Sequence, residues 1–258
     1  MTLKEALGIK AGEVVSLVGG GGKTTLMFRL AKELWEAGEL AICTTTTKIW
    51  EPSKEEAGYL LLSPDEAELT DFTVKNLPLL GRMTLVTRRL PEGKLKGVTT
   101  TLIIKLGQLL PKSFIIVEAD GSRQKSIKAP NATEPVIPEN TSLVVAVVGI
   151  DGIGATLSEE NVFRPDMVAQ LTGLNLGEAI TPEAVARLIT HKDGLAKGMP
   201  QGARLIPFIN KVDLDGGLKK SRSLARYILG TGHPTIDRVV LGSLASQNSV
   251  AEIIDIYL

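Results

Sequence analysis

The feature that most constrains this chain is a short apolar run, residues 13–18, which leads into four consecutive glycines and then Lys23-Thr24-Thr25. The apolar run predicts a strand, and leucines at helical spacing over residues 23–37 predict a helix directly after the glycines. A glycine loop in this position lets the backbone wrap closely around a phosphate group, which the loop amides and the helix N-terminus then face. The opening of the chain therefore predicts the phosphate-binding unit of an α/β protein.

Strand-like and helix-like segments alternate along the rest of the chain. Strands are predicted over 40–43, 83–88, 113–117, 142–148, 204–209 and 238–241, and helices over 101–110, 166–171, 182–189, 217–229 and 247–256. Residues 142–148 are almost entirely aliphatic, as expected for a strand of a parallel sheet that is covered on both faces. The alternation predicts an α/β fold: a three-layer P-loop NTPase-like domain with a mostly parallel central sheet.

We interpret residues 1–258 as a single domain, with loop-like insertions at the sheet edges near the charged segment 51–68 and the proline-rich segment 129–140. The 29 basic and 29 acidic residues balance, which argues against a globally basic nucleic-acid binder. No stretch reaches the roughly 20 apolar residues of a membrane span, and the N-terminus does not look like a secretory signal. We therefore expect a cytoplasmic protein that binds neither nucleic acid nor membrane.

The glycine loop is the predicted phosphate site. Lys23 supplies a charge for the β- and γ-phosphates, and the Thr24 hydroxyl is placed to ligate Mg²⁺. The pattern G-x-x-x-x-G-K-[ST] is incomplete, because Leu17 stands at its first glycine position. The run resembles the loop of the SIMIBI branch of P-loop GTPases and ATPases, although Val18 stands where their signature lysine is expected, and a simple glycine hairpin is the alternative. The residues assigned to nucleotide binding here are Gly19, Gly20, Gly21, Gly22, Lys23, Thr24 and Thr25.

A second apolar strand, residues 114–117, ends in Glu118, Ala119 and Asp120. Carboxylates at the tip of a strand beside a phosphate loop form the Walker B pattern, in which one acid holds Mg²⁺ and another orients an attacking water. Glu118 and Asp120 share one face of an extended chain. The sequence leaves open which of them serves the metal, and a strand cap with a solvated turn is the alternative.

The tetrapeptide Asn210-Lys211-Val212-Asp213 follows the predicted strand 204–209. In GTPases the pattern N-K-x-D reads guanine: one carboxylate accepts hydrogen bonds from N1–H and N2–H, which adenine cannot offer. Asn210 would tie the loops together and the Lys211 stem would cover the base. Ser243, after the predicted strand 238–241, resembles the final base-contact loop of GTPases. We predict GTP with Mg²⁺ as the ligand; ATP, or a polar turn without a base, is the alternative.

Three further segments complete a family pattern together with the glycine loop and residues 210–213. Combined, they resemble the YqeC family of selenium-dependent hydroxylase accessory proteins over nearly the whole chain. The resemblance implies a role beside a selenium-dependent molybdenum hydroxylase rather than a defined reaction. Phe163 is a departure, because a histidine is expected there. The segments are residues 43–48, residues 118–123 with 128–130 and 134–135, and residues 148–152 with 164–166.

Two functions follow as expectations. The first is a P-loop NTPase that assists maturation of that hydroxylase, with Lys23, Glu118 and Asp120 as catalytic residues and the hydroxylase or its cofactor-maturation proteins as partners. The second is a transferase that moves a phosphoryl or nucleotidyl group to a small acceptor such as a pterin cofactor or a selenium species. A homodimer is among the open alternatives. Candidate second-substrate residues are Thr47, Lys48, Arg123, Lys128 and Arg164, against the alternatives of strand-end threonines and solvated surface charge.

Overall fold

The computed structural model describes residues 1–256. Its helices are α1 Leu3–Ala6, α2 Lys23–Glu36, α3 Lys54–Ala57, α4 Glu66–Leu80, α5 Thr100–Leu109, α6 Pro165–Thr172, α7 Pro182–Thr190 and α8 Gly217–Gly230, with a 3-10 turn η1 Ile150–Gly152. Its strands are β1 Val14–Gly19, β2 Ala41–Thr45, β3 Lys48–Trp50, β4 Tyr59–Leu62, β5 Arg82–Val86, β6 Arg88–Arg89, β7 Lys94–Lys96, β8 Phe114–Glu118, β9 Ile127–Lys128, β10 Leu143–Gly149, β11 Val162–Phe163, β12 Arg204–Asn210, β13 Arg238–Gly242 and β14 Val250–Asp255.

Nine of these strands form the central sheet, in the order β14-β13-β12-β10-β1-β8-β2-β5-β4. Every neighbouring pair is parallel except β13 and β14. From β1 the chain builds one half of the sheet, returns to β8 beside β1, and then crosses to β10 on the other side of β1. Open α/β sheets bind ligands at the carboxyl ends of the strands where the strand order reverses in this way.

Alternating side chains of the central strands pack into two different layers of helices. Val145 and Val147 of β10 join the cluster of α1 and α2, whereas Val144 and Ala146 join the cluster of α6, α7 and α8. Helices α4 and α5 pack against β2, β5 and β8 in a third cluster. These apolar clusters confirm the predicted three-layer α/β architecture with a mostly parallel sheet.

The predicted helix over 247–256 is wrong, because most of this segment forms β14, antiparallel to β13. Val250, Ile253 and Ile254 are β-branched and favour a strand, and the open edge of β13 supplies the backbone partners. Sequence periodicity over such a short apolar run does not separate a strand from a helix.

The charged segment 51–68 is also not the loop that we expected. It holds α3, the strand β4 and the start of α4, and β4 is the parallel edge strand beside β5. Ser53 caps α3 through a reciprocal bond with Glu56, so the charged residues form a short helix before the strand. The high content of charged residues led us to predict a loop where a short helix and a strand lie.

The proline-rich segment 129–140 contains no helix or strand, but it does not lie at a sheet edge. The Val136 amide donates to the Ala119 carbonyl at 2.9 Å, and the Thr46 hydroxyl donates to the Val136 carbonyl at 2.8 Å. The segment therefore crosses the carboxyl ends of β8 and β2, in the interior of the sheet.

Within residues 1–256, no helix combines the length and apolar character that crossing a membrane requires.

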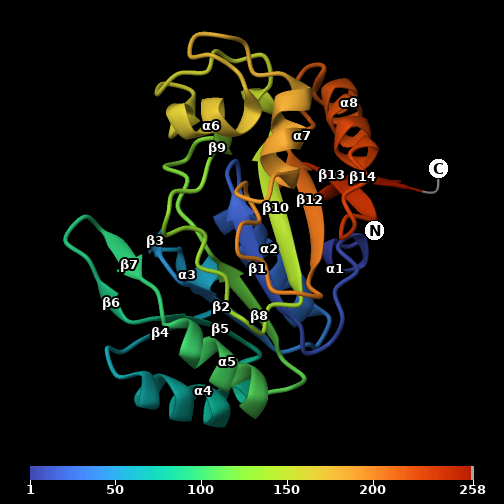
Figure 1. Ribbon diagram of the computed structural model, residues 1–258. Helices are drawn as coiled ribbons and strands as arrows, with labels where there is room; N and C mark the ends of the chain where they lie inside the picture. The colour runs from blue at the N-terminus through green and yellow to red at the C-terminus, as the bar shows by residue number, and fades with distance from the viewer. Residues whose placement is uncertain (257–258) are drawn as a thin grey trace.

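A separate three-stranded antiparallel sheet, in the order β3-β7-β6, stands beside the central sheet. Its β6–β7 hairpin projects from the body of the molecule at the left of Figure 1. Ile49 and Leu95 at its centre are buried in the core cluster of α1 and α2. We call this element the β3–β7–β6 flap; the sequence did not predict it.

Candidate functional site

An open cleft of about 650 Å³ lies at the carboxyl ends of the central strands. The glycine loop and the first turn of α2 form one end, and the loops after β12 and β13 form the other. The end of β8, the loop after it and the β3–β7–β6 flap supply further walls. The fold thus brings together the motifs that the sequence analysis singled out separately.

The glycine loop is built by close backbone contacts. The Gly20 amide donates to the Val147 carbonyl at 2.8 Å, and the Gly21 amide donates to the Lys125 carbonyl at 2.9 Å. A Cβ atom on Gly20 would lie 2.4 Å from the Lys125 oxygen, so only glycine fits there. Gly19 donates to the Asp120 carboxylate at 3.0 Å. The amides of the first three glycines therefore donate to protein acceptors, which differs from the expectation that they face an anion.

The amides available to an anion are those of Gly22, Lys23, Thr24 and Thr25. Within residues 1–256 none of them donates to a protein acceptor, and all four residues line the cleft. They form the N-terminus of the 14-residue helix α2, where unpaired amides and the helix dipole favour negative charge. This end of the cleft is suited to a phosphate group.

Lys23 is buried between two acids. Its Nζ atom lies 3.2 Å from Asp120 Oδ1 and 3.6 Å from Glu118 Oε1, and it donates to the Gly19 carbonyl at 2.7 Å. Burial alone would lower the pKa of Lys23, but the Asp120 and Glu118 carboxylates outweigh burial and raise it. The side chain is therefore a fixed positive charge under the glycine loop.

The two acids at the end of β8 have different surroundings. Glu118 lines the cleft and accepts a hydrogen bond from the Thr24 hydroxyl at 2.6 Å. Asp120 is fully buried behind the loop, where its Oδ2 atom also lies 2.7 Å from Lys128 Nζ. Burial raises the pKa of Glu118 even though Lys23 and Thr24 act against it. Of the two acids, only Glu118 faces the space in which a ligand would lie.

The donor set fits a magnesium ion that is bound together with a phosphate. Within residues 1–256 no cluster of three or more His, Cys, Asp or Glu residues could hold a metal by itself. Mg²⁺ in nucleotide sites takes one or two carboxylates or hydroxyls from the protein and further oxygens from phosphate and water. Thr24 and Glu118, with their oxygens 2.6 Å apart at the cleft wall, supply such a pair.

Asn210 clamps the two ends of the cleft to one another. Its amide nitrogen donates to the Gly21 carbonyl at 2.7 Å, and its amide oxygen accepts from the Leu244 amide at 2.9 Å. A Cβ atom on Gly22 would lie 2.5 Å from the same amide nitrogen. This clamp is the loop-tying contact that the sequence pattern predicts for Asn210.

Lys211 lines the cleft with its ammonium group anchored. Nζ lies 2.7 Å from Asp151 Oδ2 and donates to the Ser126 hydroxyl at 2.8 Å. Burial would raise the pKa of Asp151, but hydrogen bonds from Lys211 and Ser126 lower it. These contacts hold the stem of Lys211 in place beside the cleft.

Two polar side chains at this end of the cleft have no partner. Within residues 1–256 the exposed carboxylate of Asp213 makes no hydrogen bond or ion pair, and it lines the cleft beside Leu214. The Ser243 hydroxyl is also unpaired, although the residue is only 4% exposed. A buried hydroxyl without a partner is costly, and at a cleft wall it is suited to a ligand.

The five predicted second-substrate residues separate into two groups. Lys48 and Arg123 line the cleft. Lys128 is fully buried and bonded to Asp120, and Arg164 lies 2.6 Å from Glu134 and donates to the Ala129 carbonyl. Thr47 bonds within the flap region through Thr45 and Gly97, away from the cleft.

Trp50 of β3 and Lys94 of β7 are among the cleft residues that the sequence did not predict. The only signal for Trp50 is an aromatic residue three positions after the threonine run. No local sequence signal marks Lys94, because this residue reaches the cleft only through the pairing of β7 with β3.

Backbone strain concentrates around the cleft. Within residues 1–256, four non-glycine residues have a positive φ: Arg123, Gln124, Arg164 and Lys211. Three of the four line the cleft. Such conformations cost about 1–3 kcal/mol each and cluster at ligand sites. Phe163 packs under the guanidinium groups of Arg123 and Arg164.

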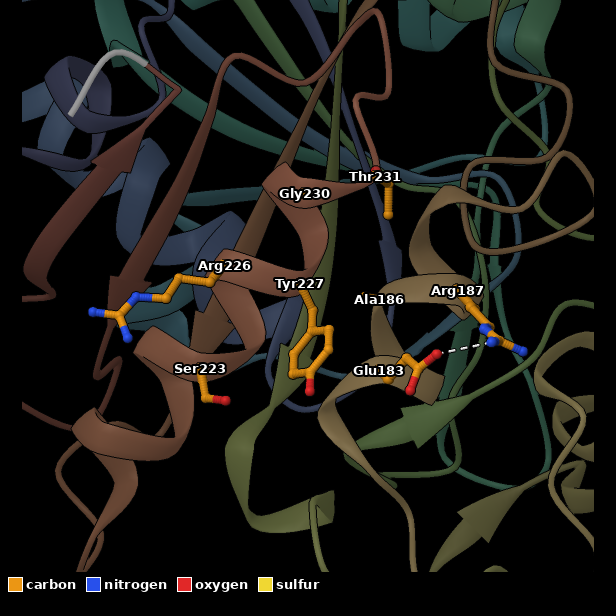
Figure 2. Close-up of a pocket in the computed structure, with 8 residues that line it drawn as sticks. All are labelled: Glu183, Ala186, Arg187, Ser223, Arg226, Tyr227, Gly230 and Thr231. Atoms are coloured by element: carbon orange, nitrogen blue, oxygen red, sulfur yellow. Dashed lines mark hydrogen bonds and ion pairs between the residues drawn. The ribbon is translucent and has the colours of Figure 1, made fainter.

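Two other features lie apart from the cleft. Cys43 is buried in β2, and burial raises the pKa of its thiol to about 12. A second hollow of about 510 Å³ lies between α7 and α8, where Tyr227 and the Glu183–Arg187 ion pair line it (Figure 2). None of its residues belongs to the motifs described above.

Fold and cleft together define a three-layer α/β protein of P-loop-like architecture. A family model described as YqeC protein matches residues 15–166. The chain is also 35% identical over 198 residues to the uncharacterized protein YqeC of Escherichia coli, an alignment that covers 77% of this chain and 75% of the relative. The protein belongs to the YqeC family.

Proposed function

We propose that this protein binds a nucleotide with Mg²⁺ in the cleft, and that the nucleotide is GTP. The observation that supports the proposal is that a single cleft has two sets of ligand-binding groups, one at each end. The unpaired amides of residues 22–25 and the Thr24–Glu118 pair lie at one end, and the unpaired Asp213 and Ser243 lie at the other.

Each end has a role in this proposal. The α2 amides and Lys23 would stabilise the phosphate charge, and Thr24 and Glu118 would hold Mg²⁺, which would neutralise further phosphate charge. Asp213 accepts hydrogen bonds from N1–H and N2–H of guanine, whereas adenine presents no donor pair there. Ser243 completes the polar contacts of the base.

The biological setting is part of the same proposal. The family pattern points to accessory proteins of selenium-dependent molybdenum hydroxylases, so we propose that GTP binding and hydrolysis assist maturation of such an enzyme. The partner is then the hydroxylase or one of its cofactor-maturation proteins. Lys23 and Glu118 would act on the reacting phosphate, with Asp120 holding Lys23 in place from behind the loop.

A transferase is the second candidate, because two cations beyond the phosphate loop line the same cleft. Lys48 and Arg123 are not needed to hold the nucleotide phosphates that α2 and Lys23 already serve. Positive charge beyond the nucleotide favours a second, anionic substrate that receives a phosphoryl or nucleotidyl group. Release of phosphate by the purified protein alone would favour the hydrolase.

Competition binding tests the nucleotide. GTP, ATP and XTP are titrated against a fluorescent guanine nucleotide, with Mg²⁺ and with EDTA. We expect GTP to compete at least about tenfold better than ATP, and Mg²⁺ to strengthen GTP binding. If ATP competes as well as GTP, the guanine assignment is wrong; if neither nucleotide competes, the nucleotide site itself is wrong.

A further inference from the structure

The exposed face of the β3–β7–β6 flap carries an unusual row of cations. Lys48 of β3 lies opposite Lys96 of β7, and Lys96 lies opposite Arg88 of β6. Residues directly opposite each other in an antiparallel sheet share a face. All three are exposed, and Ile49 and Leu95 between them point into the core. The flap therefore presents three adjacent positive charges.

Two of the three cations in this row have no ion-pair partner among residues 1–256. Within residues 1–256 neither Lys96 nor Arg88 makes an ion pair, and Lys48 pairs with Glu92 at 3.2 Å across a largely exposed contact. Like charges directly opposite one another destabilise a sheet. Arg89, on the opposite face of β6, is by contrast paired with Glu51. The uncompensated charge on one face only indicates a binding surface for an anion.

An aromatic platform stands next to the row. Trp50 pairs with Lys94 one step further along the same face, and the Lys94 Nζ atom lies 4.9 Å from the centre of the tryptophan ring. Trp50 is 52% exposed and lines the cleft. Alternate residues of a strand lie about 7 Å apart. An aromatic surface and an anion site are thus spaced like a ring and its phosphate substituent.

We propose that the flap binds a second ligand beside the nucleotide, a planar fused-ring heterocycle that carries a phosphate group. The ring stacks on Trp50, and the phosphate meets Lys48, Lys96 and Arg88. The inference rests on the proposed function in one respect, the presence of a nucleotide in the adjoining part of the cleft. A single-stranded nucleic acid is less suited, because it needs successive aromatic platforms and this face carries only one.

Flavin mononucleotide is the probe for this surface, with riboflavin and ribose 5-phosphate as matched ligands that lack the phosphate and the ring. The chain has two tryptophans, so Trp35→Phe leaves Trp50 as the sole tryptophan reporter. We expect flavin mononucleotide to quench Trp50 fluorescence saturably, and to bind at least about tenfold more tightly than either matched ligand. Equal binding of flavin mononucleotide and ribose 5-phosphate would overturn the proposal, as would tighter binding of a ten-residue thymidine oligonucleotide.

Variants locate the probe, with affinity measured by calorimetry. Trp50→Leu and Lys96→Gln should each weaken flavin mononucleotide binding about tenfold, whereas Lys105→Gln, at an exposed site on α5, should not. An equal effect of Lys96→Gln and Lys105→Gln would remove the flap from the site. The titrations are run with and without GTP and Mg²⁺. If flavin mononucleotide binds but GTP does not, the nucleotide proposal alone is refuted. If GTP binds but flavin mononucleotide does not, the proposed ligand site on the flap alone is refuted.

Discussion

The Thr24 hydroxyl donates to the Glu118 carboxylate at 2.6 Å, from the first turn of α2 to the last residue of β8. This bond distinguishes two acids that the sequence leaves equivalent. Glu118 shares the cleft wall with a hydroxyl of the kind that ligates Mg²⁺, while Asp120 is enclosed by Lys23, Lys128 and the Gly19 amide. The geometry therefore favours Glu118 for the metal and Asp120 for the scaffold.

Glu118→Gln should abolish the Mg²⁺-dependent part of GTP binding without destabilising the fold. Because burial raises the pKa of Glu118, the folded protein binds that proton more tightly than the unfolded chain, and the ionised carboxylate lowers stability above its ordinary pKa. Removing the charge should leave the free energy of unfolding at pH 7 unchanged or higher. Urea unfolding and calorimetry with and without Mg²⁺ measure the two effects.

Asp120→Asn is the matched variant with the opposite expectation. It leaves two buried ammonium groups, Lys23 and Lys128, short of a carboxylate, and should cost about 3–5 kcal/mol of stability. If Asp120→Asn folds normally and loses the Mg²⁺ effect while Glu118→Gln keeps it, the two roles are reversed.

Lys23→Met should weaken nucleotide binding and also reduce stability. The Lys23 side chain is 2% exposed and lies between two carboxylates, so its charge contributes to the stability of the fold as well as to phosphate binding. Methionine keeps much of the stem and removes the charge, so the loss reports electrostatics rather than packing, of the order of 3 kcal/mol. Thermal unfolding without ligand, followed by nucleotide titration well below the transition, separates the two effects. An unchanged melting temperature would contradict the buried ion-pair assignment.

The motifs could be predicted because each is continuous in sequence and adjoins a strong strand signal. The glycine loop follows β1, Glu118 ends β8 and Asn210 ends β12, so a parallel sheet brings them to one edge without further information. The local sequence was therefore sufficient to predict a site residue wherever that residue directly adjoins a strand in the chain.

Pairing between distant segments could not be predicted. Trp50 and Lys94 meet only through the register of β3 and β7, which no local pattern encodes. Lysine is usually an exposed residue, yet the fold buries the side chain of Lys128 against Asp120. The engagement of the Gly20 and Gly21 amides likewise depends on backbone from β10 and the loop before β9.

Cys43 should be inert towards thiol reagents in the native protein. A thiol with a pKa of about 12 is thiolate to roughly one part in ten thousand at pH 8, and burial also blocks access. We expect no reaction with 5,5′-dithiobis(2-nitrobenzoate) until denaturant is added. Rapid native labelling would instead contradict the burial of the Cys43 thiol.

Glu134→Gln should destabilise the protein at neutral pH but not in acid. Burial would raise the pKa of Glu134, but Arg164 and Lys128 lower it, so the folded state favours the ionised carboxylate. Its contribution is complete above the ordinary pKa of about 4.3 and is lost as the pH falls through the lower folded value. Melting temperatures at pH 7, 5 and 3 should converge with wild type only at the lowest pH. Glu139→Gln, at an exposed position that forms no ion pair with the described residues 1–256, should show no such dependence.

Asp213→Asn should change the preferred base from guanine to xanthine. Among residues 1–256 the Asp213 carboxylate at the cleft wall has no partner, so its hydrogen-bonding capacity is available to N1–H and N2–H of guanine. Xanthine carries an oxygen at C2, which a carboxylate repels and an asparagine amide can bind. Hydrogen bonds to a charged group contribute about 1.5–3 kcal/mol each, so the GTP-to-XTP preference should shift by at least about tenfold.

The measurement is competition of GTP, XTP and ATP against a labelled guanine nucleotide, with Asp215→Asn, exposed and outside the cleft lining, as the control. Equal shifts in both variants would mean that a general change in charge, rather than base contact by Asp213, sets the preference.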